Sequence, residues 1–285
     1  MTPIPDTYAS PLHLPFNSTC LGDFTPAGAH GDPGGEGLWL ALRGTELLLR
    51  ESEGGLSLPD RAHPILDVSA AVFLGCWRNQ VLRAVHLPRD FAPPEGFLLE
   101  NLLANQPRMD ICQLSLGGLA AQALHWEANS RFCSRCGAQT QPQPGEWGKK
   151  CVSCGYVHYP HIHPCVIVIV RRPGEVLLIR KAIWPQGRYS LVAGFLDFGE
   201  CLEEAVAREV EEETGVRVTN IRYIGSQGWP FPSQLMAGFV ADYVEGEVRV
   251  QESELEDACW FPVDALPTLP PKRSIARYLI DHYAG

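Results

Sequence analysis

The chain has 285 residues, of which 45% are apolar, and its formal net charge at pH 7 is -10. A chain of this length can bury a sizeable core and accommodates two domains, or one domain with an insertion. The acidic balance excludes a basic surface for nonspecific nucleic-acid binding, and it means that an anionic substrate would need a cation to offset the repulsion.

Location and redox state follow from apolar runs and cysteines. No apolar run reaches the roughly 20 residues of a membrane span, and the N-terminal sequence lacks the charged start and apolar centre of a signal peptide. We therefore expect a cytoplasmic protein with no membrane partner. Of the ten cysteines, four form a tight pattern and six are scattered singly, which favours metal binding and buried thiols over a disulfide framework.

The first part of the chain predicts a small β-rich domain. Residues 1 to 35 are rich in Pro and Gly, so we expect loose order there. Short apolar segments follow, separated by turn signals, which is typical of strands. Apolar residues at helical spacing predict a connecting helix over 114–131. The predicted N-terminal domain, with this helix, covers residues 1–125, and the strands are expected at 38–44, 46–51, 70–77 and 80–87.

A cysteine cluster predicts a zinc ribbon over residues 126–160. Cys133, Cys136, Cys151 and Cys154 follow the spacing C-x2-C-x14-C-x2-C. Four thiolates at this spacing hold Zn²⁺ tetrahedrally and leave no open position, so the zinc is expected to be structural. A ribbon of this kind can also bind nucleic acid, but the sequence between the two cysteine pairs has only Lys149 and Lys150 as a basic pair, with Arg135 beside the first knuckle.

The rest of the chain, residues 161–285, predicts an α/β domain. Strand-like segments alternate with helical ones, which implies a sandwich with a mixed sheet. The helices are expected after residue 201 and over 272–283, and the strands at 163–172, 175–181, 189–194, 221–227, 235–244, 246–250 and 258–263.

An acidic helix raises the question of function. Glu209, Glu212 and Glu213 stand at i, i+3 and i+4, where like charges cost roughly 0.2 to 0.5 kcal/mol per pair and oppose the helix dipole. Another face carries an apolar stripe that should pack on the sheet, formed by Leu202, Ala205, Val206 and Val210. A solvated acidic face would be the ordinary interpretation.

The full string from Gly194 to Val216 resembles the Nudix box, GX5EX7REUXEEXGU, at every specified position. The resemblance implies a Nudix α/β/α sandwich whose glutamates bind Mg²⁺ or Mn²⁺, which bridge a diphosphate and activate water. By motif, Glu209 and Glu213 are metal ligands, Glu212 is a further ligand or a base, and Glu200 and Arg208 form a bracing ion pair. The backbone carbonyl of Ala193 is expected to complete the metal shell.

A second motif narrows the substrate. The segment SQGWPFPSQ, Ser226 to Gln234, is similar to the SQPWPFPxS array of the NADH pyrophosphatase family of Nudix hydrolases, with departures at Gly228 and Gln234. Two of its aromatic side chains could stack on a flat ring. The resemblance implies that the substrate is bound by Gln227, Gly228, Trp229, Pro230, Phe231, Pro232, Ser233 and Gln234.

The same family has a four-cysteine ribbon before the Nudix domain, and its members act as homodimers. By this resemblance Glu146, Tyr159 and Ala276 contact the substrate, and Glu254 is a further metal ligand. The implied reaction is hydrolysis of the pyrophosphate of NADH or NAD⁺ to AMP and nicotinamide mononucleotide, with removal of NAD caps from RNA as a second activity. Two alternatives stay open: a Nudix hydrolase of another substrate such as ADP-ribose, and a zinc-ribbon RNA-binding module.

Overall fold

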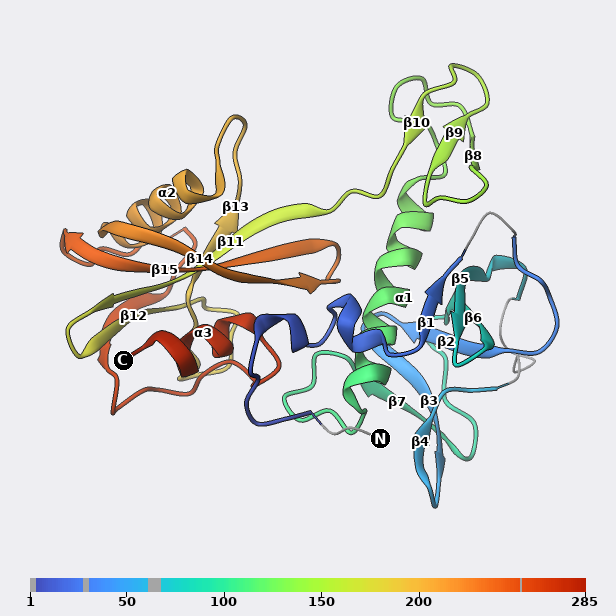
Figure 1. The fold of residues 1–285 in the computed structure, drawn as a ribbon, viewed down its shortest axis with the longest axis horizontal. Coiled ribbons are helices and arrows are strands. Elements are labelled where there is room, and N and C mark those ends of the chain that lie inside the picture. The colour runs from blue at the N-terminus through green and yellow to red at the C-terminus, as the bar shows by residue number, and fades with distance from the viewer. Residues whose placement is uncertain (1–3, 28–30, 61–67, 252) are drawn as a thin grey trace. The chain divides into compact units, whose positions relative to one another are not determined.

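A computed structural model of the chain describes residues 4–27, 31–60, 68–251 and 253–285. It divides into two compact units (Figure 1). The first unit contains Ser18–Ile162 and Trp229–Ser233, and the second contains Ile4–Asn17, His163–Gly228 and Gln234–Gly285. The domain boundaries expected from the sequence stay a prediction. In the described part of the chain, no helix has the length and apolar character needed to cross a membrane.

The first unit is built on one β-sheet, as the short apolar segments predicted. Its strand order is β1-β5-β6-β2-β3-β4, and β7 pairs with β3. Strands β2 and β6 are parallel, whereas the other paired strands are antiparallel. The strands are β1 Phe24–Pro26, β2 Leu38–Arg43, β3 Glu46–Ser52, β4 Gly55–Ser57, β5 Val72–Trp77, β6 Gln80–His86 and β7 Phe97–Asn101.

Helix α1, Ile111–Asn129, packs on this sheet. It begins three residues before the expected start because Asp110 caps it: the Asp110 carboxylate accepts from Gln113 N at 2.7 Å, and Gln113 Oε1 accepts from Asp110 N at 3.2 Å. A small three-stranded sheet follows in the order β10-β9-β8, with β8 Thr140–Pro142, β9 Lys149–Cys151 and β10 Val157–His158.

The second unit holds a mixed six-stranded sheet, as expected. Its order is β14-β15-β11-β12-β16, with β13 paired to β11. Strand β11 is parallel to β15 and antiparallel to β12 and β13. The strands are β11 His163–Arg172, β12 Glu175–Arg180, β13 Val192–Phe195, β14 Arg217–Trp229, β15 Gln234–Glu245 and β16 Asp257–Pro262.

The two helices of the second unit, α2 Leu202–Thr214 and α3 Ile275–Tyr283, cover opposite faces of this sheet (Figure 1). Alternate residues of a strand point to opposite faces. In β15, Ala237 and Phe239 join the core cluster that also contains Val206 of α2. Gly238, between them, lies under Ile275 of α3, whose Cδ1 would be 2.8 Å from a Cβ at Gly238. The unit is therefore an α/β/α sandwich.

One expected strand is absent. Residues 246–250 form no strand, because their backbone bonds to the end of α2 instead. Arg249 N donates to Thr214 O at 2.8 Å, and Gln251 N donates to Glu213 O at 3.1 Å. These carbonyls belong to the last turn of α2, where the helix supplies no further N–H donors for them. The valines of the segment still pack against the core, which explains their strand-like pattern.

The start of the chain is more ordered than its Pro and Gly content predicts. Residues Pro11–His13 and Ser18–Leu21 form 3-10 turns, and Leu14 is fully buried. Asn17, between these two turns, contacts β14, 209 residues away at Ser226, whereas Leu21 accepts hydrogen bonds from Trp77 and Cys112 of the first unit. Composition alone carries no information on such a contact.

Candidate active site

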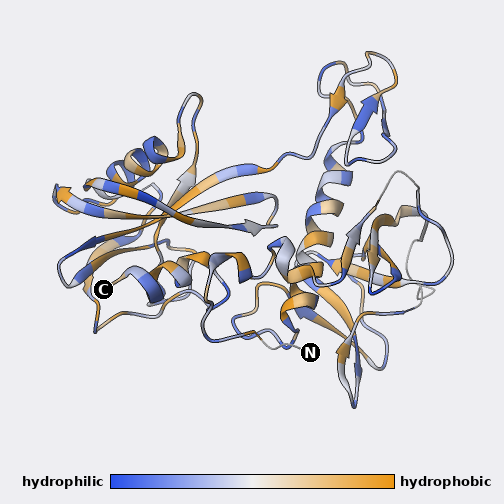
Figure 2. Ribbon diagram, viewed as in Figure 1, coloured by the Kyte–Doolittle hydropathy of each residue, from blue (hydrophilic) through white to orange (hydrophobic). Residues whose placement is uncertain are grey.

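The acidic helix α2 is fixed by both of its ends and by its apolar stripe. At the start, Glu204 Oε2 accepts from Cys201 N at 2.8 Å. At the end, Gly215 adopts a left-handed conformation with φ 71°, which glycine tolerates without strain. The stripe residues Ala205, Val206 and Val210 are fully buried in the core, as the sequence predicted. In Figure 2 the remaining surface of α2 is mostly hydrophilic.

Two of the three glutamates are buried, which the sequence did not indicate. Glu209 is 9% exposed and Glu213 is 1% exposed, whereas Glu212 is exposed. They do lie off the apolar stripe, but the loop before α2 and the sheet cover them. Buried carboxylates are costly unless they are paired or bind a cation. The interpretation as a solvated acidic face therefore does not apply to Glu209 and Glu213.

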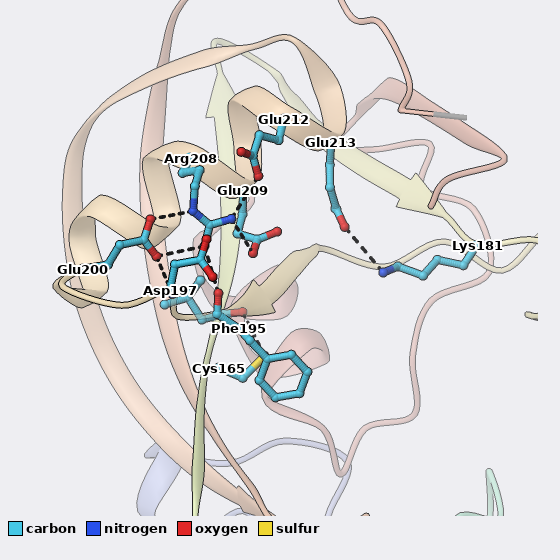
Figure 3. Close-up of polar contacts among 10 residues, drawn as sticks. Cys165, Lys181, Phe195, Asp197, Glu200, Arg208, Glu209, Glu212 and Glu213 are labelled. Atoms are coloured by element: carbon cyan, nitrogen blue, oxygen red, sulfur yellow. Dashed lines mark hydrogen bonds and ion pairs between the residues drawn. The ribbon is translucent and has the colours of Figure 1, made fainter. Parts of the chain in front are cut away.

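Arg208 holds the exposed side of this acidic group together (Figure 3). Its guanidinium lies 2.5 Å from a Glu200 oxygen and 2.9 Å from oxygens of both Glu209 and Glu212. It also donates to Phe195 O at 2.9 Å, which fixes the loop. The hydrogen bond from Arg208 lowers the pKa of Glu200 to about 2. The ion pair expected between Glu200 and Arg208 is present.

Glu213 points to the other side, toward Lys181 at the end of β12 (Figure 3). Lys181 Nζ is 3.4 Å from Glu213 Oε1, while the buried Glu213 Oε2 has no hydrogen-bond partner among the described residues. Burial raises the pKa of Glu213 to about 7, and the charges of Glu209 and Glu254 add to this rise while Lys181 opposes it. Burial also raises the pKa of Glu209. The site therefore has more negative than positive charge, and one Glu213 oxygen is available to bind a cation.

Gly194 allows Glu209 to approach the sheet. A Cβ at Gly194 would lie 1.9 Å from Glu209 Cδ, which no side chain could tolerate. Ala193, whose carbonyl was expected to join the metal shell, precedes Gly194 in β13 and pairs with Ile167 of β11. The glycine that opens the Nudix box thus has a role beyond the turn: it vacates the space that a buried carboxylate fills.

These observations fit a divalent cation at the buried end of the acidic group. Carboxylate oxygens are the ligands that Mg²⁺ and Mn²⁺ prefer, and Glu213 Oε2 is buried and without a hydrogen-bond donor among the described residues. Glu254 is exposed, and its charge is felt at both Glu209 and Glu213. The carboxylate oxygens of these glutamates are not gathered as closely as the ligands of a complete metal site. Within the described ranges, only the four cysteines bring three or more ligand atoms within 4.8 Å of one another.

Lys181 is a site residue that the sequence analysis missed. Lys181 directly follows β12, and nothing in the local sequence distinguishes it from other basic residues. The pairing of β12 with β11 places it next to Glu213 in the last turn of α2. Cys165 was also missed: it is buried in β11, and Glu209 and Glu213 are among the charges that raise its thiol pKa, after burial itself. No spacing in the sequence marks either residue.

The cysteine cluster forms a compact second centre in the first unit. Cys133 Sγ is 3.7 Å from Cys154 Sγ, and Cys136 Sγ is 3.5 Å from Cys151 Sγ. Gly137 and Gly155 turn each knuckle with φ 77° and φ 71°. Backbone N–H groups, that of Cys154 first, lower the pKa of the Cys151 thiol, which favours the thiolate that binds metal. This four-thiol site fits structural Zn²⁺ with no open position.

The expected substrate array is divided between the two units. Gln227, Gly228 and Gln234 belong to the second unit, whereas Trp229–Ser233 group with the first. The rings of Trp229 and Phe231 meet edge to face with centroids 5.5 Å apart. The Gln227 side chain is fully buried, and its amide bonds to Pro15, Arg273 and Ile275 of its own unit. A contact between Gln227 and substrate is thereby limited to its backbone.

The remaining expected contacts belong to different units. In the first unit, Tyr159 Oη is 3.5 Å from Glu146 Oε1, and Tyr159 is exposed. In the second unit, Ala276 is buried in the first turn of α3. The roles expected for these three residues stay predictions.

Comparison with known families agrees with this organisation. Residues 161–283 match a model described as the NUDIX domain, residues 128–159 match the NADH pyrophosphatase zinc ribbon domain, and residues 36–126 match the NADH pyrophosphatase-like rudimentary NUDIX domain. The β-rich domain at the start, whose role the sequence did not reveal, is therefore similar to a reduced copy of the fold that follows it.

Similar proteins carry the same combination. The chain is 45% identical over 210 residues to a protein named NAD-capped RNA hydrolase NudC from Pseudomonas aeruginosa, covering 74% of this chain and 75% of the relative. It is 40% identical to a protein of the same name from Chromobacterium violaceum, covering 86% and 90%. A NUDIX hydrolase structure from Nitrosomonas europaea matches 54% of this chain and 92% of its own at 26% identity and a TM-score of 0.44. The chain belongs to the NADH pyrophosphatase family of Nudix hydrolases.

Proposed function

We propose that this protein hydrolyses the pyrophosphate bond of NADH or NAD⁺, giving AMP and nicotinamide mononucleotide. The observation that carries the proposal is the buried Glu213 oxygen without a hydrogen-bond donor among the described residues, next to the buried Glu209 in a complete Nudix box. Family membership supports the dinucleotide as substrate.

In this proposal Glu209 and Glu213 hold Mg²⁺ or Mn²⁺, with Glu254 and the carbonyl of Ala193 as further ligands. A bound divalent cation would stabilise charge on the phosphoryl oxygens and lower the pKa of an attacking water. Arg208 keeps the Glu209 and Glu212 carboxylates in place through contacts of 2.9 Å each. Glu212, which is exposed, is the candidate base or an additional ligand.

Substrate recognition is assigned to the array and to three further residues. Trp229 and Phe231 supply aromatic surface, and Pro230, Pro232, Ser233 and Gln234 shape the loop around them. Glu146, Tyr159 and Ala276 are proposed as further contacts on the strength of the family motif. A homodimer and a cytoplasmic location are also proposed from that resemblance and from the sequence, and sedimentation analysis would check the first.

Removal of NAD caps from RNA is a second proposed activity. It is favoured by the names of the relatives, which are called NAD-capped RNA hydrolases. The NAD cap and free NAD⁺ present the same pyrophosphate, so one set of glutamates would serve both reactions.

Initial rates on NADH, NAD⁺, ADP-ribose and NAD-capped RNA, each with Mg²⁺ and with Mn²⁺, test the proposal. We expect the nicotinamide substrates to be cleaved fastest. Glu213→Gln should lower turnover at least about a hundredfold, because the cation that stabilises charge on the phosphoryl oxygens loses an anionic ligand. Glu211→Gln, an exposed glutamate of the same helix, is the matched control and should keep activity. Faster cleavage of ADP-ribose, or an active Glu213→Gln variant, would refute the assignment.

A further inference from the structure

The stretch Ser10–Asn17, part of the blue segment near the start of the chain in Figure 1, contacts β14 where the substrate array begins. Asn17 is the centre of this contact. Its Oδ1 accepts from Gly228 N at 2.9 Å, and its Nδ2 donates to Ser226 O at 3.2 Å and to Pro11 O at 2.9 Å. The acceptor and both donors of one side-chain amide are thus in use, which also fixes the orientation of that amide.

Two glycines of β14 make room for this stretch. A Cβ at Gly225 would lie 2.7 Å from Pro11 Cγ, so a larger residue would push the proline ring away. A Cβ at Gly228 would lie 3.1 Å from Phe16 O, which is tighter than most contacts allow. Strand β14 and the N-terminal stretch therefore approach each other closely at two places: Gly225 meets the Pro11 ring, and Gly228 meets the Phe16 backbone.

Gln227, the residue of β14 directly before Gly228, anchors the same strand through its side-chain amide. Its Nε2 donates to Pro15 O and to Arg273 O, both at 2.9 Å, and its Oε1 accepts from Ile275 N at 2.8 Å. It therefore joins three segments that are distant in the sequence: the N-terminal stretch, the array and the start of α3. A buried amide with all of these bonds made is expensive to disturb, because losing one partner leaves a buried polar group unsatisfied.

We propose that Ser10–Asn17 is an internal brace of the substrate loop, and that Asn17 is a positioning residue for the array. The proposal rests on the proposed function, in which Trp229 and Phe231 bind the dinucleotide. Asn17 bonds to the backbone of Ser226 and Gly228, the latter directly before Trp229, and so fixes the direction in which the loop leaves β14.

The brace also accounts for the departure of the array from its family pattern at position 228. The pattern has proline there, and proline has no N–H to donate. In this chain the N–H of Gly228 is the donor to Asn17 Oδ1. Glycine at 228 and asparagine at 17 therefore form the two sides of one hydrogen bond that proline at 228 could not make.

The first test compares Asn17→Ala with the wild type and with Ser10→Ala. Ser10 caps the first turn of the same stretch and makes no hydrogen bond to the array, so it is a matched control. We expect Asn17→Ala to raise KM for NADH about fivefold, the usual size of a lost hydrogen bond. Because the glutamates are untouched, kcat should stay within about twofold. A variant that melts earlier but keeps its KM would overturn the positioning role.

A double-mutant cycle with Gly228→Pro tests the pairing. Since both changes break the same bond, the double variant should have nearly the KM of the more impaired single variant. If the fold-increases in KM of the two single variants multiply in the double variant, the two residues act independently and the proposal fails.

Hydrogen exchange separates this proposal from the proposed function. In Asn17→Ala, the Gly228 amide should exchange at least about fivefold faster than in the wild type, whatever the substrate is. Unchanged exchange at Gly228 would refute the proposed role of Asn17, even if the enzyme is active. If the wild type cleaves no dinucleotide, the proposed function is refuted, and the exchange result alone tests whether Asn17 holds the start of the array.

Discussion

At the scale of single residues, the site is governed by Glu213, a carboxylate that burial keeps from ionising easily. Its pKa is raised from 4.5 to about 7, chiefly by burial. A protein keeps such a group at a cost, and the cost is offset only when a cation binds. In the sequence, the clustered glutamates of α2 look electrostatically unfavourable. In the structure they form a site that a bound cation would complete.

We predict that Glu213→Gln stabilises the metal-free protein at high pH. The pKa of Glu213 is higher in the folded protein than in the unfolded chain, so this carboxyl does not destabilise the fold below the unfolded pKa. As the pH rises through about 7, the folded protein has to ionise a buried carboxyl and loses stability. The gain on substitution should approach about 3 kcal/mol at most near pH 8 and vanish near pH 4. Urea unfolding with a chelator present would measure it, with Glu211→Gln as control. A variant that is less stable than the wild type at high pH would contradict the prediction.

Gly194→Ala should abolish activity without unfolding the protein. The new Cβ would occupy the place of the Glu209 carboxylate, 1.9 Å from its Cδ, so that side chain must leave the buried position. We expect turnover to fall about a hundredfold or more, as for loss of a ligand to the cation that stabilises the phosphoryl oxygens. Steady-state rates and a far-UV spectrum would show it. Gly54→Ala, whose Cβ would meet only Ser52 Oγ at 3.8 Å, is the control. Full activity of Gly194→Ala would mean that Glu209 is dispensable where it lies.

At the scale of elements, regular segments could be predicted and their irregular contacts could not. Strands β11 and β12 follow from continuous apolar runs joined by a turn signal, helix α3 follows from its amphipathic pattern, and the complete motif identified α2. Residues 246–250 show the limit: their valines alternate like a strand, yet the backbone bonds to the end of α2. Local pattern reports which side chains are buried, but it does not report which backbone group takes each hydrogen bond.

The same limit applied to the site. The motif gave the identities of Glu209 and Glu213, but their burial depends on the covering sheet and on the space left by Gly194. Lys181 could be found only from strand pairing, because no local pattern links it to α2. Likewise, the contact of Asn17 with Gly228 spans 211 residues and leaves no periodic signal.

The zinc ribbon should behave as an element that metal stabilises independently of the glutamate site. Cys136→Ser removes one of four thiols that lie within 4.8 Å of one another, so zinc binding should be lost. Native mass spectrometry would show loss of one zinc ion, and hydrogen exchange should increase over 133–154 while α2, which has its own core, stays protected. Cys201→Ser, an exposed cysteine outside the cluster, should keep its zinc. A ribbon that stays protected without zinc would contradict the structural role.

At the scale of the whole molecule, charge decides between the competing functions. The chain carries a net charge of -10. Of the few basic residues in the ribbon, Lys149 is buried and its Nζ is 2.5 Å from Glu127 Oε2, so its charge is already neutralised. Arg131, Arg135 and Lys150 stay exposed, which is too little for a row of phosphate contacts. An RNA chain attached to the NAD cap would therefore gain little attraction from this surface, and the alternative of an RNA-binding module loses support.

We predict that cleavage of NAD-capped RNA depends only weakly on salt. A protein that makes many phosphate contacts loses about a thousandfold or more in affinity between about 50 mM and about 200 mM salt. For this protein, kcat/KM on capped RNA should fall by less than about threefold over that range. The control is kcat/KM on NAD⁺ at the same salt and cation concentrations, because it reports any effect of salt on the glutamate site itself. A steep fall seen for capped RNA alone would reveal a basic RNA-binding surface, and it would restore the RNA-binding module as a function of the ribbon.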